Sequence, residues 1–253
     1  MENQISLRYH LLDTIRGAVL ISMICYHGAW NLVHLYGIHW RWYAGTGAYV
    51  WQQSICWTFI FLSGFCWSFG KKHWKRGLMV FGGGLLVSIV TLLVMPENRV
   101  LFGVLTLIGS CMLLMIPLDK VCRKIPAEAG ALTSAVLFVL TRNVNRGYLG
   151  FEGWNLLELP REWYHGVLAT YVGFVPDEFY STDYFSLMPW FFLFLTGYFV
   201  CLICKKRKVL ENEIFLKQMP ALSAIGKQSL LIYLLHQPVL YGIGELLVLC
   251  GVL

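Results

Sequence analysis

Charged side chains are scarce in this chain. Lys, Arg, Asp and Glu make up 13% of its 253 residues, whereas 57% are hydrophobic and 15% are aromatic. An ordinary soluble domain carries about 25% charged residues, so this composition excludes a water-exposed globule as the default. It also excludes a disordered chain, because disordered segments have low hydrophobicity and few aromatic residues. The composition therefore predicts a polytopic membrane protein.

Cysteine and histidine pairs with the spacing of metal ligands are also lacking. The eight cysteines stand singly in or beside apolar runs, and only Cys201 and Cys204 form a CxxC pair. Because a basic run follows that pair at once and no second pair accompanies it, we interpret it as the end of a helix. We therefore expect free thiols, no disulfide framework and no metal.

Long soluble segments are scarce as well, since charge-poor stretches occupy most of the chain. They cover about residues 12–36, 47–69, 78–95, 101–118, 127–141, 187–204 and 228–250. Apolar stretches of about 20 residues are typical of membrane-crossing helices. The sequence therefore predicts an all-α fold, a polytopic transmembrane helix bundle of about seven spans that forms one domain over residues 1–253. The start of the chain lacks a signal-peptide pattern, so the first stretch is expected to remain as a span.

Basic residues cluster after the second, fourth and sixth stretches, which end on the same side of a seven-span bundle. The clusters are Lys71, Lys72, Lys75 and Arg76; Lys120, Arg123 and Lys124; and Lys205, Lys206, Arg207 and Lys208. Cytoplasmic loops carry an excess of Lys and Arg, so we expect this side and the N-terminus in the cytoplasm and the C-terminus outside the plasma membrane. Topology thus explains the 20 basic against 14 acidic residues, and nucleic acid is not expected as a partner.

The one long connection, residues 142–186, then faces outward and carries more acidic than basic side chains. Its apolar piece at 163–175 is too short to cross a bilayer as a helix. It therefore either lies at the interface or re-enters the membrane as an eighth segment. A connection this long in a compact domain is usually functional.

Ionisable groups in an apolar span point to a functional site, because they are costly in hydrocarbon and tend to face a cavity or one another. Eleven residues of α-helix turn by about 1,100°, so Arg16 and His27 lie on one face about 16 Å apart along the axis. Asn31 and His34 continue this polar stripe. Asp13 stands three residues before Arg16, where it can form an ion pair with it.

The functional interpretation of the stripe gives each end a role. Arg16, near the basic side, would bind an anionic ligand, and His27, deeper in the membrane, would act as a general base on a hydroxyl or amine. In the alternative interpretation, Asp13 and Arg16 anchor the helix at the membrane surface and His27 is a hydrogen-bonded core residue. For the aligned stripe as a whole we favour the functional interpretation.

The last stretch supplies a second polar group. Pro238 lacks a backbone N–H and is expected to interrupt the helix, so His236 either satisfies the released carbonyl or belongs to the site. Tyr233 and Gln237 share a helix face and are expected to form a wall of the same cavity. Gln52, in the second stretch, is a buried amide that needs a partner and is a further candidate for binding substrate.

The Trp-rich segment at residues 39–43 follows the first stretch on the outer side. It is typical of an aromatic belt at a membrane interface. Its His39 and Arg41 are alternatively candidates for holding an extracellular substrate. Small residues at Ser63-Gly64 and in the glycine run 82–84 predict close helix packing, and the run is not a phosphate loop because no Lys-Ser/Thr follows.

Five motifs, spread in order over most of the chain, resemble a known family. They are Arg8 with Asp13, Arg16 and Gly17; Phe61 to Gly64; Leu101 to Gly109; Asp183 to Trp190; and Gly226 and Lys227 with Tyr233 and His236 to Pro238. Together they resemble the DUF1624 family, whose relatives include the catalytic domain of heparan-alpha-glucosaminide N-acetyltransferase, and more distantly the membrane acyltransferase-3 proteins.

The resemblance implies transfer of an acyl group, most simply acetyl, from cytoplasmic acetyl-CoA to a sugar-like hydroxyl or amine on the outer face. Acyltransferase-3 proteins have an Arg-x10-His pattern in their first span, which makes His27 the implied catalytic histidine. In the heparan-type relatives an asparagine stands at that position and the histidine comes about eleven residues later. His39 therefore stays the reserve candidate, with His34 also in that region. Asp183, within a matched motif, is an implied substrate residue.

The cytoplasmic surface agrees with an acyl-CoA donor. Lys71, Lys72 and Arg76 would attract the phosphates of CoA, and Arg16 would pair with one of them. The drop of about 16 Å from Arg16 to His27 is comparable to the reach of an extended pantetheine arm. The thioester would then arrive beside the histidine.

Two chemical routes and two functions stay open at this point. Asn31 or Gln52 would donate a hydrogen bond to the tetrahedral oxyanion, whether transfer is direct or passes through an acetyl-histidine. The alternative function is a solute or lipid-linked sugar transporter, although the spans show no inverted repeat. Besides the lipid bilayer, the expected partners are the acyl donor and a glycan-like acceptor, and a homo-oligomer is compatible with the sequence.

Overall fold

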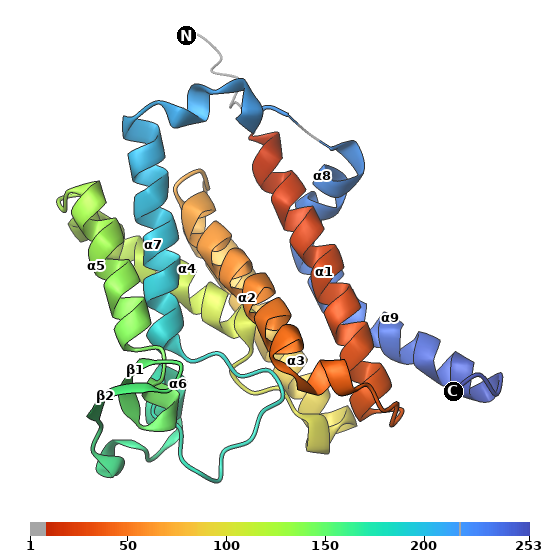
Figure 1. The fold of residues 1–253 in the computed structure, drawn as a ribbon. Coiled ribbons are helices and arrows are strands. Elements are labelled where there is room, and N and C mark those ends of the chain that lie inside the picture. The colour runs from red at the N-terminus through yellow and green to blue at the C-terminus, as the bar shows by residue number, and fades with distance from the viewer. Residues whose placement is uncertain (1–8, 218) are drawn as a thin grey trace. The chain divides into compact units, whose positions relative to one another are not determined.

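The computed structural model describes residues 9–217 and 219–253, which form a mostly helical chain (Figure 1). The chain separates into two compact units. The first lies within residues 1–59 and 208–253, and the second is residues 60–207. The boundary falls inside α2 (Thr46–Trp67), so each unit contains part of this helix.

The first unit is built around one long helix, α1 (His10–His34), against which two helices from the end of the chain pack. Its other elements are a 3₁₀ turn (Arg41–Ala44), the first part of α2, two 3₁₀ turns (Val209–Glu211 and Glu213–Phe215), α8 (Pro220–Lys227) and α9 (Ser229–Leu249). Leu20, Met23 and Ile55 form a buried core in this unit, and the partly buried Ile225 and Tyr233 pack on it. Burial of this apolar area stabilises the contact of α1 with its neighbours.

Two glycines bring α8 into backbone contact with α1. A Cβ atom at Gly17 would lie 1.9 Å from the carbonyl oxygen of Leu222. One at Gly226 would lie 1.9 Å from the carbonyl oxygen of Asp13. No larger residue fits at either position without separating the helices. The contact places α8 beside the first turns of α1 (Figure 1).

The second unit contains the remaining helices and a small hairpin. Its elements are the end of α2, α3 (His73–Val94), a 3₁₀ turn (Pro96–Asn98), α4 (Val104–Cys122), α5 (Ala127–Leu140), a 3₁₀ turn (Val144–Arg146), β1 (Tyr148–Phe151), β2 (Trp154–Glu158), a 3₁₀ turn (Arg161–Trp163), α6 (Val167–Val172) and α7 (Leu187–Lys206). α3 packs along α4, and α5 packs along α7. The seven charge-poor stretches of the sequence therefore all lie in helices, which confirms the helical part of the prediction.

Close helix packing occurs where the small residues predict it. A Cβ atom at Gly64 of α2 would lie 1.9 Å from the carbonyl oxygen of Phe194 in α7. On the facing side, one at Gly197 would lie 2.1 Å from the carbonyl oxygen of Phe61. In the glycine run of α3, Gly84 meets the backbone of Thr106 in α4. Such contacts let backbones approach without side chains between them, as in membrane helix pairs.

The connection at 142–186 contains a β-hairpin and a short helix, and the sequence did not predict the hairpin. β1 and β2 pair in an antiparallel hairpin whose two-residue turn is Glu152 and Gly153, both with positive φ. Two positive φ values are what a tight hairpin turn requires, and a glycine supplies one of them without strain. α6 has six residues, about 9 Å, so the piece at 163–175 does not cross the membrane as a helix.

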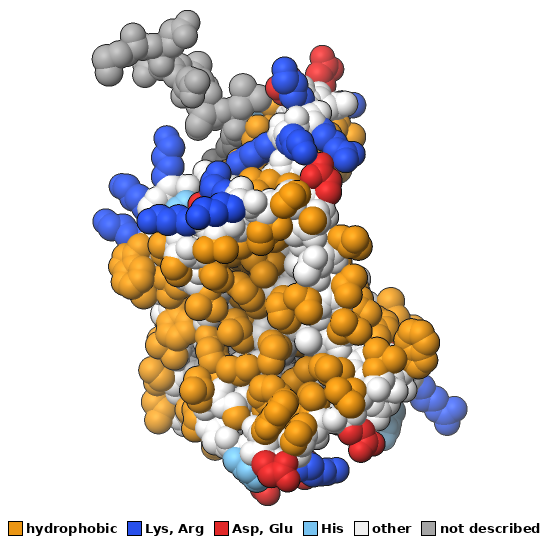
Figure 2. Space-filling model, turned by 90° about the vertical axis from the view of Figure 1, so that its left-hand side faces the viewer, with side chains coloured by type: hydrophobic (Ala, Val, Ile, Leu, Met, Phe, Trp, Pro, Cys, Tyr) orange, Lys and Arg blue, Asp and Glu red, His pale blue; other side chains and the backbone are white. Residues whose placement is uncertain are grey.

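Within residues 9–217 and 219–253, four helices are long and apolar enough to cross a membrane, namely α3, α4, α7 and α9. α5 has 14 residues, or about 21 Å, which is short of a hydrocarbon core of about 30 Å. α1 and α2 are longer but carry several polar residues. Figure 2 shows the face of the second unit that carries α5, where hydrophobic side chains cover the middle and Lys and Arg gather at one end. The structure supports a helical membrane protein, and the count of seven spans stays a prediction.

Gly17→Ala tests the contact between α1 and α8. The added methyl group overlaps the Leu222 carbonyl, so we expect a destabilisation of about 1–3 kcal/mol and a lower melting temperature in detergent. Gly242→Ala in α9 is the control, because a Cβ there meets nothing within 4 Å and helix propensity improves by up to about 1 kcal/mol. Equal melting temperatures for the two variants would contradict the packing described.

Candidate functional site

The polar stripe predicted for the first stretch lies on one continuous helix. α1 runs from His10 to His34, so the spacing that puts Arg16 and His27 on one face holds. Nη1 of Arg16 donates to Oδ1 of Asp13 at 3.1 Å, and the Asp13 side chain is 8% exposed. The expected ion pair is therefore present, and it restrains the guanidinium.

A chain of three hydrogen-bonded side chains joins α1 to α9. Nδ2 of Asn31 donates to Oε1 of Gln237 at 3.1 Å. Nε2 of the same Gln237 amide lies 3.3 Å from Nδ1 of His27, to which it donates. Asn31 is 3% exposed, so the chain begins at a fully buried amide. The structure thus brings together three of the candidate residues.

His236 adds a second imidazole to this group. Its ring centroid lies 4.9 Å from that of His27, and its Nδ1 is hydrogen-bonded to the backbone oxygen of Tyr233. Its Nε2 is buried and has no hydrogen-bond partner among the residues that the structure describes. A buried polar atom without a protein partner is uncommon, and it is able to bind a water molecule or a substrate group. We call His27, Asn31, His236 and Gln237 the two-histidine cluster.

The helix that carries His236 is not interrupted, contrary to the prediction from Pro238. α9 is helical from Ser229 to Leu249, and Pro238 lies inside it. Proline removes one backbone hydrogen bond, which the remaining turns of the helix tolerate. His236 bonds a carbonyl five residues before the proline. The carbonyl that His236 satisfies is therefore not the one that a kink at Pro238 would release.

α9 has one apolar and one polar side. Leu231, Leu235, Val239 and Ile243, spaced four residues apart, are all exposed. Such a stripe is typical of a lipid-facing surface. The polar residues that contact α1 lie on another face of the same helix, so the two-histidine cluster faces α1 and not the lipid.

Aromatic side chains lie next to the cluster. The ring centroid of Tyr26 is 6.0 Å from His27, 5.4 Å from Tyr43 and 5.3 Å from Trp51. His34 contacts this aromatic group, with a centroid distance of 6.0 Å to Tyr43. His34 is therefore the less suitable alternative to His27, because it stands among aromatic rings instead of the hydrogen-bonded amides.

The segment with the reserve candidate His39 lies at the surface. His39 and Arg41 are exposed, as are Trp40 and Trp42, whose ring centroids are 5.7 Å apart. Among the described residues, no hydrogen bond joins His39 or Arg41 to the two-histidine cluster. Their roles in binding substrate stay predictions.

Two further substrate candidates have structural partners of their own. Oε1 of Gln52 accepts from Nε2 of Gln53 at 3.4 Å on the same helix. In the second unit, Oδ2 of Asp183 accepts from the backbone N–H of Val104 at 3.4 Å. Val104 is the first residue of α4, so Asp183 satisfies an unpaired N–H at a helix start. A role of either residue toward a substrate stays a prediction.

The basic candidates of the second unit lie between the end of α2 and the first turn of α3. Lys71, Lys72 and Arg76 are exposed in and after the α2–α3 connection. Beside them, His73 stacks on Trp67 with a centroid distance of 4.1 Å. The connection is thereby held against the end of α2.

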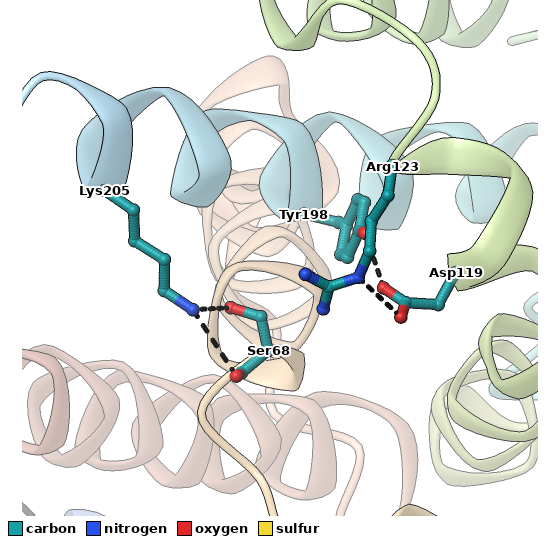
Figure 3. A network of polar contacts seen from close by, with 5 residues as sticks. All are labelled: Ser68, Asp119, Arg123, Tyr198 and Lys205. Atoms are coloured by element: carbon teal, nitrogen blue, oxygen red, sulfur yellow. Dashed lines mark hydrogen bonds and ion pairs between the residues drawn. The ribbon is translucent and has the colours of Figure 1, made fainter.

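A polar network ties the same end together (Figure 3). Oδ1 of Asp119 accepts from the Tyr198 hydroxyl at 2.6 Å, and its Oδ2 accepts from Nε of Arg123 at 2.7 Å. This bond to the carboxylate raises the pKa of the Arg123 guanidinium, which stays charged. Nζ of Lys205 donates to the Ser68 hydroxyl at 2.8 Å and to its backbone oxygen at 3.4 Å. The three basic clusters of the second unit thus lie at one end of it, as the topology predicts.

The sequence predicts no metal site. The part of the chain that the structure describes holds no group of three or more His, Cys, Asp or Glu side chains that could bind a metal ion.

The apolar helices, the basic end of the second unit and the buried two-histidine cluster of the first unit are typical of one class, the helical integral membrane proteins. Within this class, the chain belongs to the family described as heparan-alpha-glucosaminide N-acetyltransferase, catalytic, whose profile matches residues 8–238. The match confirms the resemblance predicted from the five motifs and points to a membrane acetyltransferase-like protein. No curated protein and no solved structure matches the chain with statistical significance.

Asp119→Asn tests the network at the basic end. The substitution weakens a charge-assisted bond to Arg123 and the acceptor for Tyr198, so we expect a loss of about 1–3 kcal/mol in thermal unfolding. Glu128→Gln is the control, because Glu128 is 41% exposed in its ion pair with Lys206, and solvent screens such a pair so that its contribution is small. An equal loss in both variants would contradict a structural role for Asp119.

Proposed function

We propose that the chain transfers an acetyl group from acetyl-CoA on the cytoplasmic side to a sugar-like hydroxyl or amine on the outer side of the plasma membrane. The observation that carries this proposal is the two-histidine cluster, in which imidazoles from α1 and α9 lie 4.9 Å apart in a hydrogen-bonded, largely buried setting. Family membership supports the reaction class. The basic end supports the orientation, with the N-terminus inside and the C-terminus outside.

The cluster contains the groups that acyl transfer needs. An acceptor hydroxyl or amine must lose a proton as it attacks the thioester, and a neutral imidazole is a suitable base at cellular pH. The negative charge that develops on the carbonyl oxygen must be met by a donor. Two imidazoles and two amides supply both kinds of group within one hydrogen-bonded set, so no metal is required for this step.

The donor side is proposed at the other end of α1. Arg16 is held by Asp13, about 16 Å along the helix from His27, and supplies a fixed cation for a phosphate of CoA. The sequence also predicts Lys71, Lys72 and Arg76 as residues that bind the cofactor, because their positive charge would attract the phosphates of a nucleotide.

The acceptor side is proposed around the aromatic residues near the cluster. Trp40 and Trp42 are 44% and 47% exposed, and exposed indole rings suit stacking on the apolar face of a sugar. His39 and Arg41, in the same segment, would bind its polar groups. Asp183, Gln52 and Tyr233 stay candidates for this role.

Acetyl-CoA and CoA are expected to raise the melting temperature of the purified protein in detergent, and Arg16→Ala is expected to reduce the shift. A ligand at about 100 times its dissociation constant contributes about 2.7 kcal/mol, which a thermal-shift assay resolves. Acetate alone should produce no shift, because the phosphates carry the recognition. A transporter of unrelated solutes would show no response to CoA.

His27→Ala is expected to lower acetyl transfer by about 10² or more while leaving the CoA-induced thermal shift intact, because the imidazole lies far from the phosphates. Release of the free CoA thiol measures turnover. Unchanged turnover in this variant, together with loss in His39→Ala, would move the reaction to the exposed segment.

A further inference from the structure

The two imidazoles of the cluster carry their protons on opposite ring nitrogens. The backbone oxygen of Tyr233 can only accept, so Nδ1 of His236 must donate and carries the proton of the neutral ring. Nε2 of His236 is then left with a lone pair. This atom is the buried one that has no partner among the described residues.

In His27 the proton of the neutral ring lies on the other nitrogen. Asn31 donates to Oε1 of Gln237, which orients the Gln237 amide so that its Nε2 faces His27. An amide N–H can only donate, so Nδ1 of His27 accepts. The proton of the neutral His27 ring therefore lies on Nε2, where it is a donor and not a base.

We propose that His236 is the proton acceptor of the reaction and that His27 is the donor that stabilises the oxyanion. This inference rests on the proposed acetyl transfer and changes the assignment within it, since the sequence predicts His27 as the base. Gln237 and Asn31 are positioning residues, because they fix the protonation state of His27 and need not contact substrate.

The step balances with these groups alone. The acceptor oxygen or nitrogen forms a bond to the thioester carbonyl carbon as its proton passes to Nε2 of His236, which becomes an imidazolium. The electron pair of the carbonyl moves to its oxygen, which accepts a hydrogen bond from Nε2–H of His27. Collapse of the tetrahedral intermediate breaks the carbon–sulfur bond, and the CoA thiolate takes the proton back from His236.

The kinetic test compares matched His→Gln variants, with acetyl-CoA as donor, D-glucosamine or water as acceptor, and free CoA thiol as the readout. Glutamine is a donor but not a base. His236→Gln should therefore lower kcat by about 10² to 10⁴, whereas His27→Gln keeps an N–H donor and should lose about 10-fold or less. His165→Gln, in an exposed loop, is the control with unchanged rate. The CoA-induced thermal shift shows that each variant is folded.

Gln237→Glu reverses the polarity of the hydrogen-bond chain. A carboxylate can only accept, so it draws the proton of His27 to Nδ1 and removes the Nε2 donor. We expect kcat to fall by about 10². If His27 were the base, the same change would leave its Nε2 free to accept and activity would be kept or increased, which would overturn the assignment.

The protonation states of the two imidazoles can also be tested by NMR in the absence of turnover. In protein labelled with ¹⁵N-histidine and embedded in lipid nanodiscs, we expect the Nδ1–H form for His236 and the Nε2–H form for His27. The reverse pattern would overturn the inference even in an active enzyme. A wild-type protein that shows these forms but releases no CoA from acetyl-CoA would overturn the proposed function and leave the hydrogen-bond assignment standing.

Discussion

The hydrogen-bonded contact of Gln237 with α1 is the interaction on which the site depends. Its amide joins Asn31 and His27, which lie one turn apart on α1, to a helix more than two hundred residues later in the sequence. In an apolar environment each of these groups would be costly to leave without a partner. The two bonds of the Gln237 amide to α1 hold α9 in one orientation about its axis, and in that orientation His236 lies beside His27.

Helix formation was predictable because apolar stretches separated by charged residues carry a strong signal. The number of membrane crossings was less predictable, because α5 is short and because polar residues lower the hydropathy of α1 and α2. The hairpin at 148–158 was missed. Its signal is a two-residue Glu152-Gly153 turn between short β-prone runs, which is weak within a segment that otherwise reads as a loop.

The periodicity of one helix predicts which of its residues share a face, and this placed Arg16, His27 and Asn31 correctly on α1. It does not predict which atom of a neighbouring helix meets them. Gln237 and Tyr233 share a face of α9. The Gln237 side chain is hydrogen-bonded to Asn31 and His27 of α1, whereas the backbone oxygen of Tyr233 is hydrogen-bonded to His236 of its own helix. The protonation state of each imidazole follows from such contacts. The sequence alone could therefore identify the histidines, but it could not predict which of them accepts a proton and which donates one.

The backbone contact of α8 with α1 also restricts how the first turns of α1 can move. Because Gly17 and Gly226 leave no side chain between the two helices, the first turns of α1 cannot tilt or rotate unless α8 travels with them. The Arg16 side chain is thus carried by a pair of packed helices, α1 and α8, and not by the end of one isolated helix. If CoA binds at Arg16 as proposed, any opening beside the first turns of α1 has to move α8 together with α1.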